Sequence, residues 1–179
     1  PLALKYREYF QAIRRARAEQ FAAENYSDKR KYLALIAHNN MKESLMEFCG
    51  IHTNKLETFP LIATGTTGSM LYKKTGLCLS KKVASGPLGG DQAVGTLIST
   101  QNICGVIFFR DPLSPHPHHA DIEALGRLCD VYQVPFATNP QSGEAILDYL
   151  LSGKSERESI PNHVLQTYIQ GQTKVVEAR

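Results

Sequence analysis

The stretch FPLIATGTTGSMLYKKTG, residues 59–76, runs from an apolar segment through two glycines and three threonines into a mixed segment. The apolar part, residues 59–63, has the length and continuity of a buried strand. Residues 63–68 form a glycine-rich turn, and residues 69–76 have the composition of a short helix. A strand, a glycine-rich turn and a helix in this order predict one unit of an α/β fold.

The same plan recurs along the chain. Further apolar runs with the length of buried strands are KYLALIAH at 31–38, ICGVIFFRDP at 103–112 and VPFATN at 134–139. Helical patterns follow them at 41–50, 120–132 and 140–151. Because strands that are apolar throughout are buried on both faces, this alternation predicts a three-layer, doubly wound α/β fold with a mostly parallel sheet.

Polar and glycine-rich residues follow the predicted strands. In an open parallel sheet the carboxyl ends of the strands meet at one edge, and ligands bind there at the topological switch point. We therefore expect four short segments to gather at this edge: His38–Asn39, Thr64–Gly68, Asp111–Pro112 and Thr138–Asn139.

The composition is that of one soluble globular domain. The chain has 179 residues, 42% hydrophobic and 21% charged, and its formal net charge of +3 gives no reason to expect nucleic acid. No apolar run approaches the roughly 18 residues that a membrane span needs, so no membrane is expected. Four cysteines without a CxxC pair, and no signal-peptide pattern, predict a reduced, cytoplasmic protein.

The segment from Tyr6 to Glu24 places Tyr6, Phe10 and Ile13 on one face of a predicted helix. We expect that face to pack on the domain or on a neighbouring subunit. The predicted organisation is an N-terminal amphipathic helix and linker at 1–30, an α/β domain at 31–150 and a C-terminal tail at 151–179.

Two turns have the residues of an anion site. In ATGTTG, residues 63–68, backbone N–H groups at a helix start and three threonine hydroxyls suit a phosphate or carboxylate. A capped turn would explain one threonine, and the stretch is neither a Walker motif nor GxGxxG. In SGPLGGDQ, residues 85–92, further donors precede Asp91. An aspartate at a helix start is usually an N-cap, but glycines beside a phosphate site let a substrate approach the carboxylate closely.

The loop RDPLSPHPHHAD, residues 110–121, contains three histidines. Zinc is an alternative, but their spacing is too compact for a known structural pattern and no cysteine cluster accompanies them, so we expect no metal. A neutral His118 that polarises a carbonyl, oriented by Asp121 or Asp111, fits the pattern better. We expect His116 and His119 to lie in a solvated loop.

AHNNMK, residues 37–42, closes the first predicted strand. Asn39 or Asn40 has the side chain of an N-cap for the helix that follows. His38 and Lys42 can turn toward the anion site, where Lys42 adds positive charge for a phosphate.

These motifs together resemble the methylglyoxal synthase family. ALIAHNNMK, ATGTTG, SGPLGGDQAVGTLIS, VIFFRDPL, PHHADIEAL and VPFATN occur in that family's order and spacing from about Lys31 to Leu150. The resemblance implies a lyase that converts dihydroxyacetone phosphate to methylglyoxal and inorganic phosphate without a cofactor, a bypass of part of glycolysis. It also implies a homohexamer that phosphate inhibits.

The resemblance also implies roles for single residues. The base falls on Asp91 and the carbonyl-facing histidine on His118, with supporting aspartates at Asp111 and Asp121. The implied substrate and phosphate contacts are His38, Lys42, Thr64, Gly65, Thr66, Thr67, Ser85 and Gly86.

Four residues, at three places in the sequence, depart from the family's pattern. Asn39 stands where the family usually has aspartate, His119-Ala120 interrupts a common His-Asp-Pro-Asp run, and Gln170 lies near the place of a C-terminal arginine. The alternative is therefore a non-catalytic, anion-binding allosteric module, as the same fold serves in carbamoyl phosphate synthetase. Retention of Asp91, His118 and Asp121 favours the enzyme, because such a module needs no base.

Overall fold

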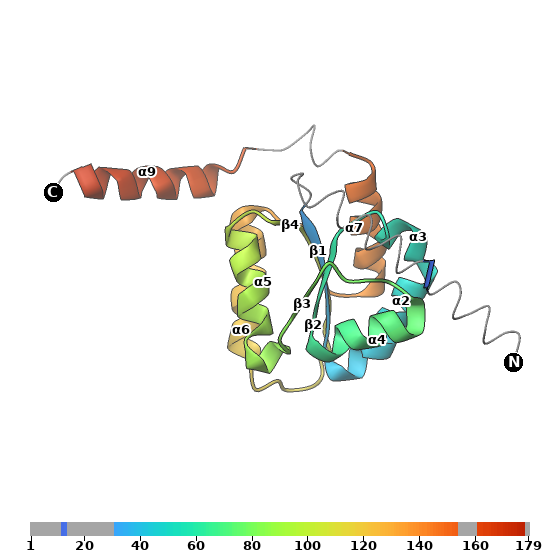
Figure 1. The fold of residues 1–179 in the computed structure, drawn as a ribbon. Helices are drawn as coiled ribbons and strands as arrows, with labels where there is room; N and C mark the ends of the chain where they lie inside the picture. Colours follow the sequence, from blue (N-terminus) through green and yellow to red (C-terminus); the bar gives the residue numbers. More distant parts are fainter. Residues whose placement is uncertain (1–11, 14–30, 154–160, 178–179) are drawn as a thin grey trace, which may run out of the picture.

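The computed structural model describes residues 12–13, 31–153 and 161–177. Its centre is a five-stranded sheet in the order β3-β2-β1-β4-β5, in which all neighbouring strands are parallel (Figure 1). The strands are β1 (Tyr32–Ala37), β2 (Leu61–Thr64), β3 (Lys81–Val83), β4 (Ile103–Phe109) and β5 (Phe136–Ala137). The parallel, doubly wound sheet predicted from the sequence is confirmed.

Helices cover both faces of the sheet, which makes three layers (Figure 1). One face carries α2 (Lys42–Ile51), α3 (Thr53–Leu56), α4 (Gly65–Thr75) and α7 (Pro140–Leu151), and the other carries α5 (Gly90–Ser99) and α6 (His119–Tyr132). Two single 3-10 turns, η1 (Asn39–Met41) and η2 (Gly86–Leu88), precede α2 and α5. Within the described ranges, no helix is long and apolar enough to cross a membrane.

Successive residues of β1 enter different cores. Leu33 and Leu35 pack with residues of α2, α4 and α7, whereas Ala34 and Ile36 pack with residues of α5 and α6. Side chains alternate along a strand with a period of two, so a strand covered on both faces must be apolar at every position. Each fully buried leucine contributes about 1.5–3 kcal/mol to stability. This requirement accounts for the continuous apolar run YLALIA.

The strand order places the topological switch point between β1 and β4. From β1 the chain moves to β2 and β3 on one side, and then returns to β4 on the other side. Ala37 and Phe109 are register partners at the ends of these strands, and the His38 N–H donates to the Phe109 carbonyl at 3.1 Å. His38 and Asp111 therefore leave the sheet side by side, as expected for segments at this edge.

Parts of the described chain differ from the sequence-based expectation. Strand β3 was not predicted, because it has only three residues at the sheet edge and its two lysines are exposed. The C-terminal tail contains a helix, α9 (His163–Glu177), and Asn162 before it donates to the Val131 carbonyl of α6 at 2.6 Å. The predicted N-terminal helix lies outside the described residues apart from Ala12 and Ile13, which are helical.

Candidate functional site

A buried carboxylate and an imidazole form the centre of the candidate site. Asp91 lies in the first turn of α5 with 2% of its surface exposed, and its Oδ2 is 2.8 Å from Nδ1 of His118. Its Oδ1 is buried and has no hydrogen-bond partner among the described residues. Burial raises the pKa of Asp91; the His118 contact opposes this shift and the charge of Asp121 adds to it. A carboxylate with a raised pKa is a stronger base than a solvated one.

Asp91 does not cap its helix. The N-cap position of α5 is Gly89, with a φ of 95°, and no side-chain capping bond is formed there. The alternative role of Asp91 as an N-cap is therefore excluded. Its carboxylate is directed to His118 instead, which leaves it available for chemistry.

Gly86 allows the loop of η2 to approach this pair closely. A Cβ at residue 86 would lie 3.0 Å from Asp91 Oδ2 and 3.0 Å from Cε1 of His118. A side chain at this position would therefore displace the carboxylate or the ring. Glycine brings the backbone beside Asp91 without that conflict.

The two glycine-rich turns meet beside this pair. Helix α4 begins at Gly65, and a Cβ there would overlap the Ser85 hydroxyl, so the start of α4 lies directly against the start of η2. The side chain of Thr64, at the N-cap of α4, makes no capping bond, and the buried Thr67 Oγ1 has no partner among the described residues. A helix start with uncapped N–H groups and an unpartnered hydroxyl suits an anion.

Lys42 connects the end of β1 to the start of α4. Its Nζ donates to Asn39 Oδ1 at 2.7 Å and to Thr66 Oγ1 at 2.5 Å. Neither Asn39 nor Asn40 caps α2, because Asn40 Nδ2 donates to Asp111 Oδ2 at 2.8 Å and the helix has no side-chain capping bond. The expectation of an asparagine N-cap is wrong. Asn39 instead contacts Lys42, and Asn40 contacts the loop that contains Asp111.

His38 is buried at the switch point. Its Nδ1 accepts a hydrogen bond from the Asp111 backbone N–H at 2.8 Å, so the ring hydrogen must be on Nε2. That Nε2 is buried and has no partner among the described residues. Burial, together with the positive charges of His116, His118 and Arg110, lowers the pKa of His38 to about 4. His38 is thus a neutral N–H donor at physiological pH.

The contact with Asp91 changes the role expected of His118. The sequence predicted a neutral ring oriented by Asp121 or Asp111, but the carboxylate at its Nδ1 is that of Asp91. When Asp91 is ionised, Nδ1 carries the hydrogen, and Nε2 of a neutral His118 is an acceptor. His118 can donate to a substrate oxygen only as the imidazolium. Among these histidines, His38 has the geometry of the neutral donor.

The two supporting aspartates have different positions. Asp121 lies in the first turn of α6, where its N–H donates to the His118 carbonyl at 3.0 Å and its charge acts on Asp91. The carboxylate of Asp111 is held by its own loop and by Asn40. Hydrogen bonds from Ser114, from Asn40 and from the Leu113 N–H lower the pKa of Asp111 to about 2. Asp111 therefore reaches the site through its backbone N–H rather than its carboxylate.

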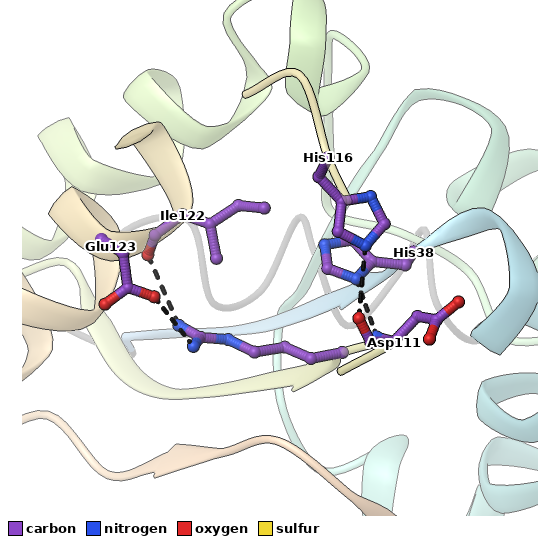
Figure 2. A network of polar contacts seen from close by, with 6 residues as sticks. His38, Asp111, His116, Ile122 and Glu123 are labelled. Atoms are coloured by element: carbon purple, nitrogen blue, oxygen red, sulfur yellow. Dashed lines mark hydrogen bonds and ion pairs between the residues drawn. The ribbon is translucent and has the colours of Figure 1, made fainter. Parts of the chain in front are cut away.

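Arg110 points away from this group. Its guanidinium donates to the Ile122 carbonyl at 3.4 Å and to Glu123 at 3.3 Å, both in α6 (Figure 2). It also lies 5.1 Å from the ring centroid of Phe136 and 5.7 Å from that of Phe108. Arg110 thus ties the end of β4 to α6. Within the ranges that the structure describes, no three His, Cys, Asp or Glu side chains are grouped to hold a metal ion.

The fold and these contacts define a doubly wound α/β protein with two glycine-rich turns and a buried carboxylate–histidine pair at its switch point. Residues 44–138 match the family described as the MGS-like domain. The chain is 44% identical to methylglyoxal synthase from Saccharophagus degradans over 145 residues, covering 81% of this chain and 92% of the relative. It is 49% identical to methylglyoxal synthase from Clostridioides difficile over 122 residues, covering 68% and 88%.

A solved structure gives the same result in three dimensions. The crystal structure of methylglyoxal synthase from Elizabethkingia anophelis superposes with a TM-score of 0.62 at 43% identity, covering 66% of this chain and 77% of that chain. The chain belongs to the methylglyoxal synthase family.

Proposed function

We propose that this chain is a lyase that converts dihydroxyacetone phosphate to methylglyoxal and inorganic phosphate. Membership of the family supports this activity. The observation that carries the proposal is the state of Asp91, a buried carboxylate with a raised pKa and one oxygen without a partner among the described residues. A protein that only bound phosphate would gain nothing from such a group.

The reaction begins with removal of a proton from the hydroxymethyl carbon of the substrate. Asp91 Oδ1 is the oxygen available to take it, because Oδ2 contacts His118. The electron pair moves onto the neighbouring carbonyl oxygen and forms an enediolate. The Nε2–H of His38 stabilises that oxygen as a neutral donor, and His118 does so in its imidazolium form.

Phosphate leaves in the next step. A proton moves from the hydroxyl of the first carbon to the enediolate oxygen on the second carbon. The oxygen on the first carbon then forms the aldehyde carbonyl, the carbon–carbon double bond shifts to the carbon that bears phosphate, and the carbon–oxygen bond to phosphate breaks with its electron pair on the phosphate, which takes up the proton removed in the first step. The resulting enol tautomerises to methylglyoxal. The groups that we propose hold the leaving phosphate are Lys42, Thr64, Gly65, Thr66, Thr67, Ser85 and Gly86. The ammonium of Lys42 and the uncapped start of α4 both stabilise the charge that develops there.

We further propose a cytoplasmic homohexamer that acts on this small phosphorylated substrate without a metal or cofactor, and that phosphate inhibits. The family resemblance supports these features. Each step above uses only side chains and backbone donors of this chain.

The test is an assay with dihydroxyacetone phosphate in which released phosphate and methylglyoxal are measured together. We expect equal amounts of the two products from the native chain and neither from Asp91→Asn. Phosphate binding without product release would contradict the proposal and favour the allosteric-module alternative.

A further inference from the structure

His116 has no assigned role, and the sequence pattern predicted a solvated position for it. The structure contradicts that prediction, because His116 is half-buried and its ring lies against His38. The two ring centroids are 3.5 Å apart with 31° between the ring planes (Figure 2). His119 is exposed as expected, but it is the first residue of α6 and not part of a loop.

His116 and His38 are also joined through the backbone of one residue. The Asp111 N–H donates to Nδ1 of His38 at 2.8 Å, and Nε2 of His116 lies 3.3 Å from the Asp111 carbonyl oxygen (Figure 2). Because a carbonyl can only accept, Nε2 of His116 carries the hydrogen. The two stacked rings thus hold the Asp111 backbone, His38 through its N–H and His116 through its carbonyl oxygen.

This arrangement specifies one state of His38. Rotation of the ring would break the Asp111 bond and the contact with His116. Phe108, whose ring meets His38 edge to face at 4.9 Å, limits the ring from another direction. Protonation of Nδ1 would remove the acceptor that the Asp111 N–H needs. The ring is therefore held with its hydrogen on Nε2, the atom left without a partner among the described residues.

We propose that His116 is a positioning residue, whose ring and N–H hold the Asp111 backbone and His38 so that the His38 Nε2–H is presented to the substrate as a neutral donor. The inference rests on the proposed function for its catalytic consequence. Four nearby groups change the pKa of His38 electrostatically: His116, His118, Arg110 and Asp111. Asp111 alone raises it and so favours the charged ring. Loss of His116 removes one of the electrostatic contributions that lower the pKa of His38.

The experiment compares the full-length native protein with His116→Ala, His116→Phe and His116→Gln. Alanine removes the ring and the donor, phenylalanine restores a flat ring, and glutamine restores a donor. We expect His116→Ala to lower kcat/KM by roughly ten- to a hundredfold, as expected when a catalytic group is misplaced. Phenylalanine and glutamine should each recover part of the loss. His119→Ala is the matched control and should leave kcat/KM unchanged.

The second readout is the tautomer of His38 in ¹⁵N-labelled protein, followed by NMR as the pH is lowered. Native His38 should show the Nε2–H form at neutral pH, and His116→Ala should mix the tautomers and raise the pKa of His38. Unchanged His38 signals in His116→Ala would overturn the proposal, whatever the activity. If alanine prevents folding, the same comparison with His116→Phe decides. If the native chain lacks synthase activity, the proposed function fails while the tautomer comparison still tests the positioning role.

Discussion

Asp91 Oδ2 and Nδ1 of His118 lie 2.8 Å apart although 27 residues separate them in sequence, and the other carboxylate oxygen of Asp91 has no partner among the described residues. An ionised Asp91 therefore has one oxygen stabilised by His118 and one buried oxygen that no described residue stabilises. Burying a charge with an incomplete set of hydrogen bonds costs stability. Burial of the Asp91 carboxylate thus lowers the stability of the folded protein. The same burial raises the pKa of Asp91, which makes it a stronger base for proton abstraction.

Asp91→Asn should separate catalysis from stability. The amide keeps the shape but cannot act as a base, so we expect kcat to fall by at least the ~10²–10⁴ typical of a general acid–base group. At neutral pH the free energy of unfolding should rise by about 1 kcal/mol, because a desolvated charge is replaced by a neutral group. Steady-state kinetics and urea unfolding measure the two effects.

The exposed Asp130 of α6 offers a matched control. Asp130→Asn makes the same chemical change outside the candidate site and should alter neither quantity. Activity of Asp91→Asn within threefold of the native value would remove Asp91 from the mechanism.

The pH dependence should follow from the raised pKa of Asp91. The base works only when ionised, so activity should be lost as the pH falls through a value above the ordinary aspartate pKa of 3.8. A raised pKa in the folded state also means that the native carboxylate is destabilising above that pKa and that this penalty disappears as the pH falls below it. The stability gain of Asp91→Asn should therefore shrink in acid. Equal gains at neutral and acid pH would contradict the burial of the charge.

Gly86→Ala should disrupt the site through shape alone. The added Cβ would meet both Asp91 Oδ2 and His118 Cε1 at 3.0 Å, so the pair must move. A displacement near 1 Å at reacting groups can cost about a hundredfold in rate, and we expect kcat/KM to fall by roughly that factor. Gly50→Ala is the control, because a Cβ there meets nothing within 4 Å. A fully active Gly86→Ala enzyme would show that the pair tolerates this movement.

The sequence predicted the fold well because the signals that specify it are local. An apolar run such as YLALIA must be buried on both faces, and glycine-rich segments after such runs indicate the ligand-binding edge of a parallel sheet. Strand β3 was missed because Lys81–Val83 is short, exposed and at the edge, where neither signal exists.

The sequence names candidate site residues but not the contacts between them. The glycine- and threonine-rich turn could be recognised from residues 63–68 alone. The Asp91–His118 pair and the Asp111–His38 bond join positions 27 and 73 residues apart, and no local pattern specifies which histidine atom meets which group. His116 was misjudged for the same reason, since proline-rich surroundings indicate a loop but not the ring against which it packs.

Asn39 stands where the family usually has aspartate, and the structure changes what we expect an aspartate to do at this position. An aspartate at this position, considered from the sequence, would raise the pKa of Asp91 as a like charge. The structure places Asn39 Oδ1 2.7 Å from Lys42 Nζ, which also donates to Thr66 at 2.5 Å. An aspartate would form an ion pair with Lys42 and largely compensate its charge. The aspartate should therefore change the affinity for the phosphate anion and not the pKa of Asp91.

We accordingly predict that Asn39→Asp weakens binding of inorganic phosphate by about two- to fivefold, the scale of a solvent-exposed ion pair, and leaves the acid limb of the pH–rate profile in place. The loss should diminish as salt is added, because exposed charges are screened. Isothermal titration with phosphate and steady-state kinetics across pH measure the two quantities, with the exposed Asn54→Asp as a charge-matched control on α3. If Asn39→Asp instead moves the acid limb upward and leaves phosphate affinity unchanged, residue 39 acts on Asp91 rather than through Lys42, and the contact between Asn39 and Lys42 does not set the charge of the phosphate site.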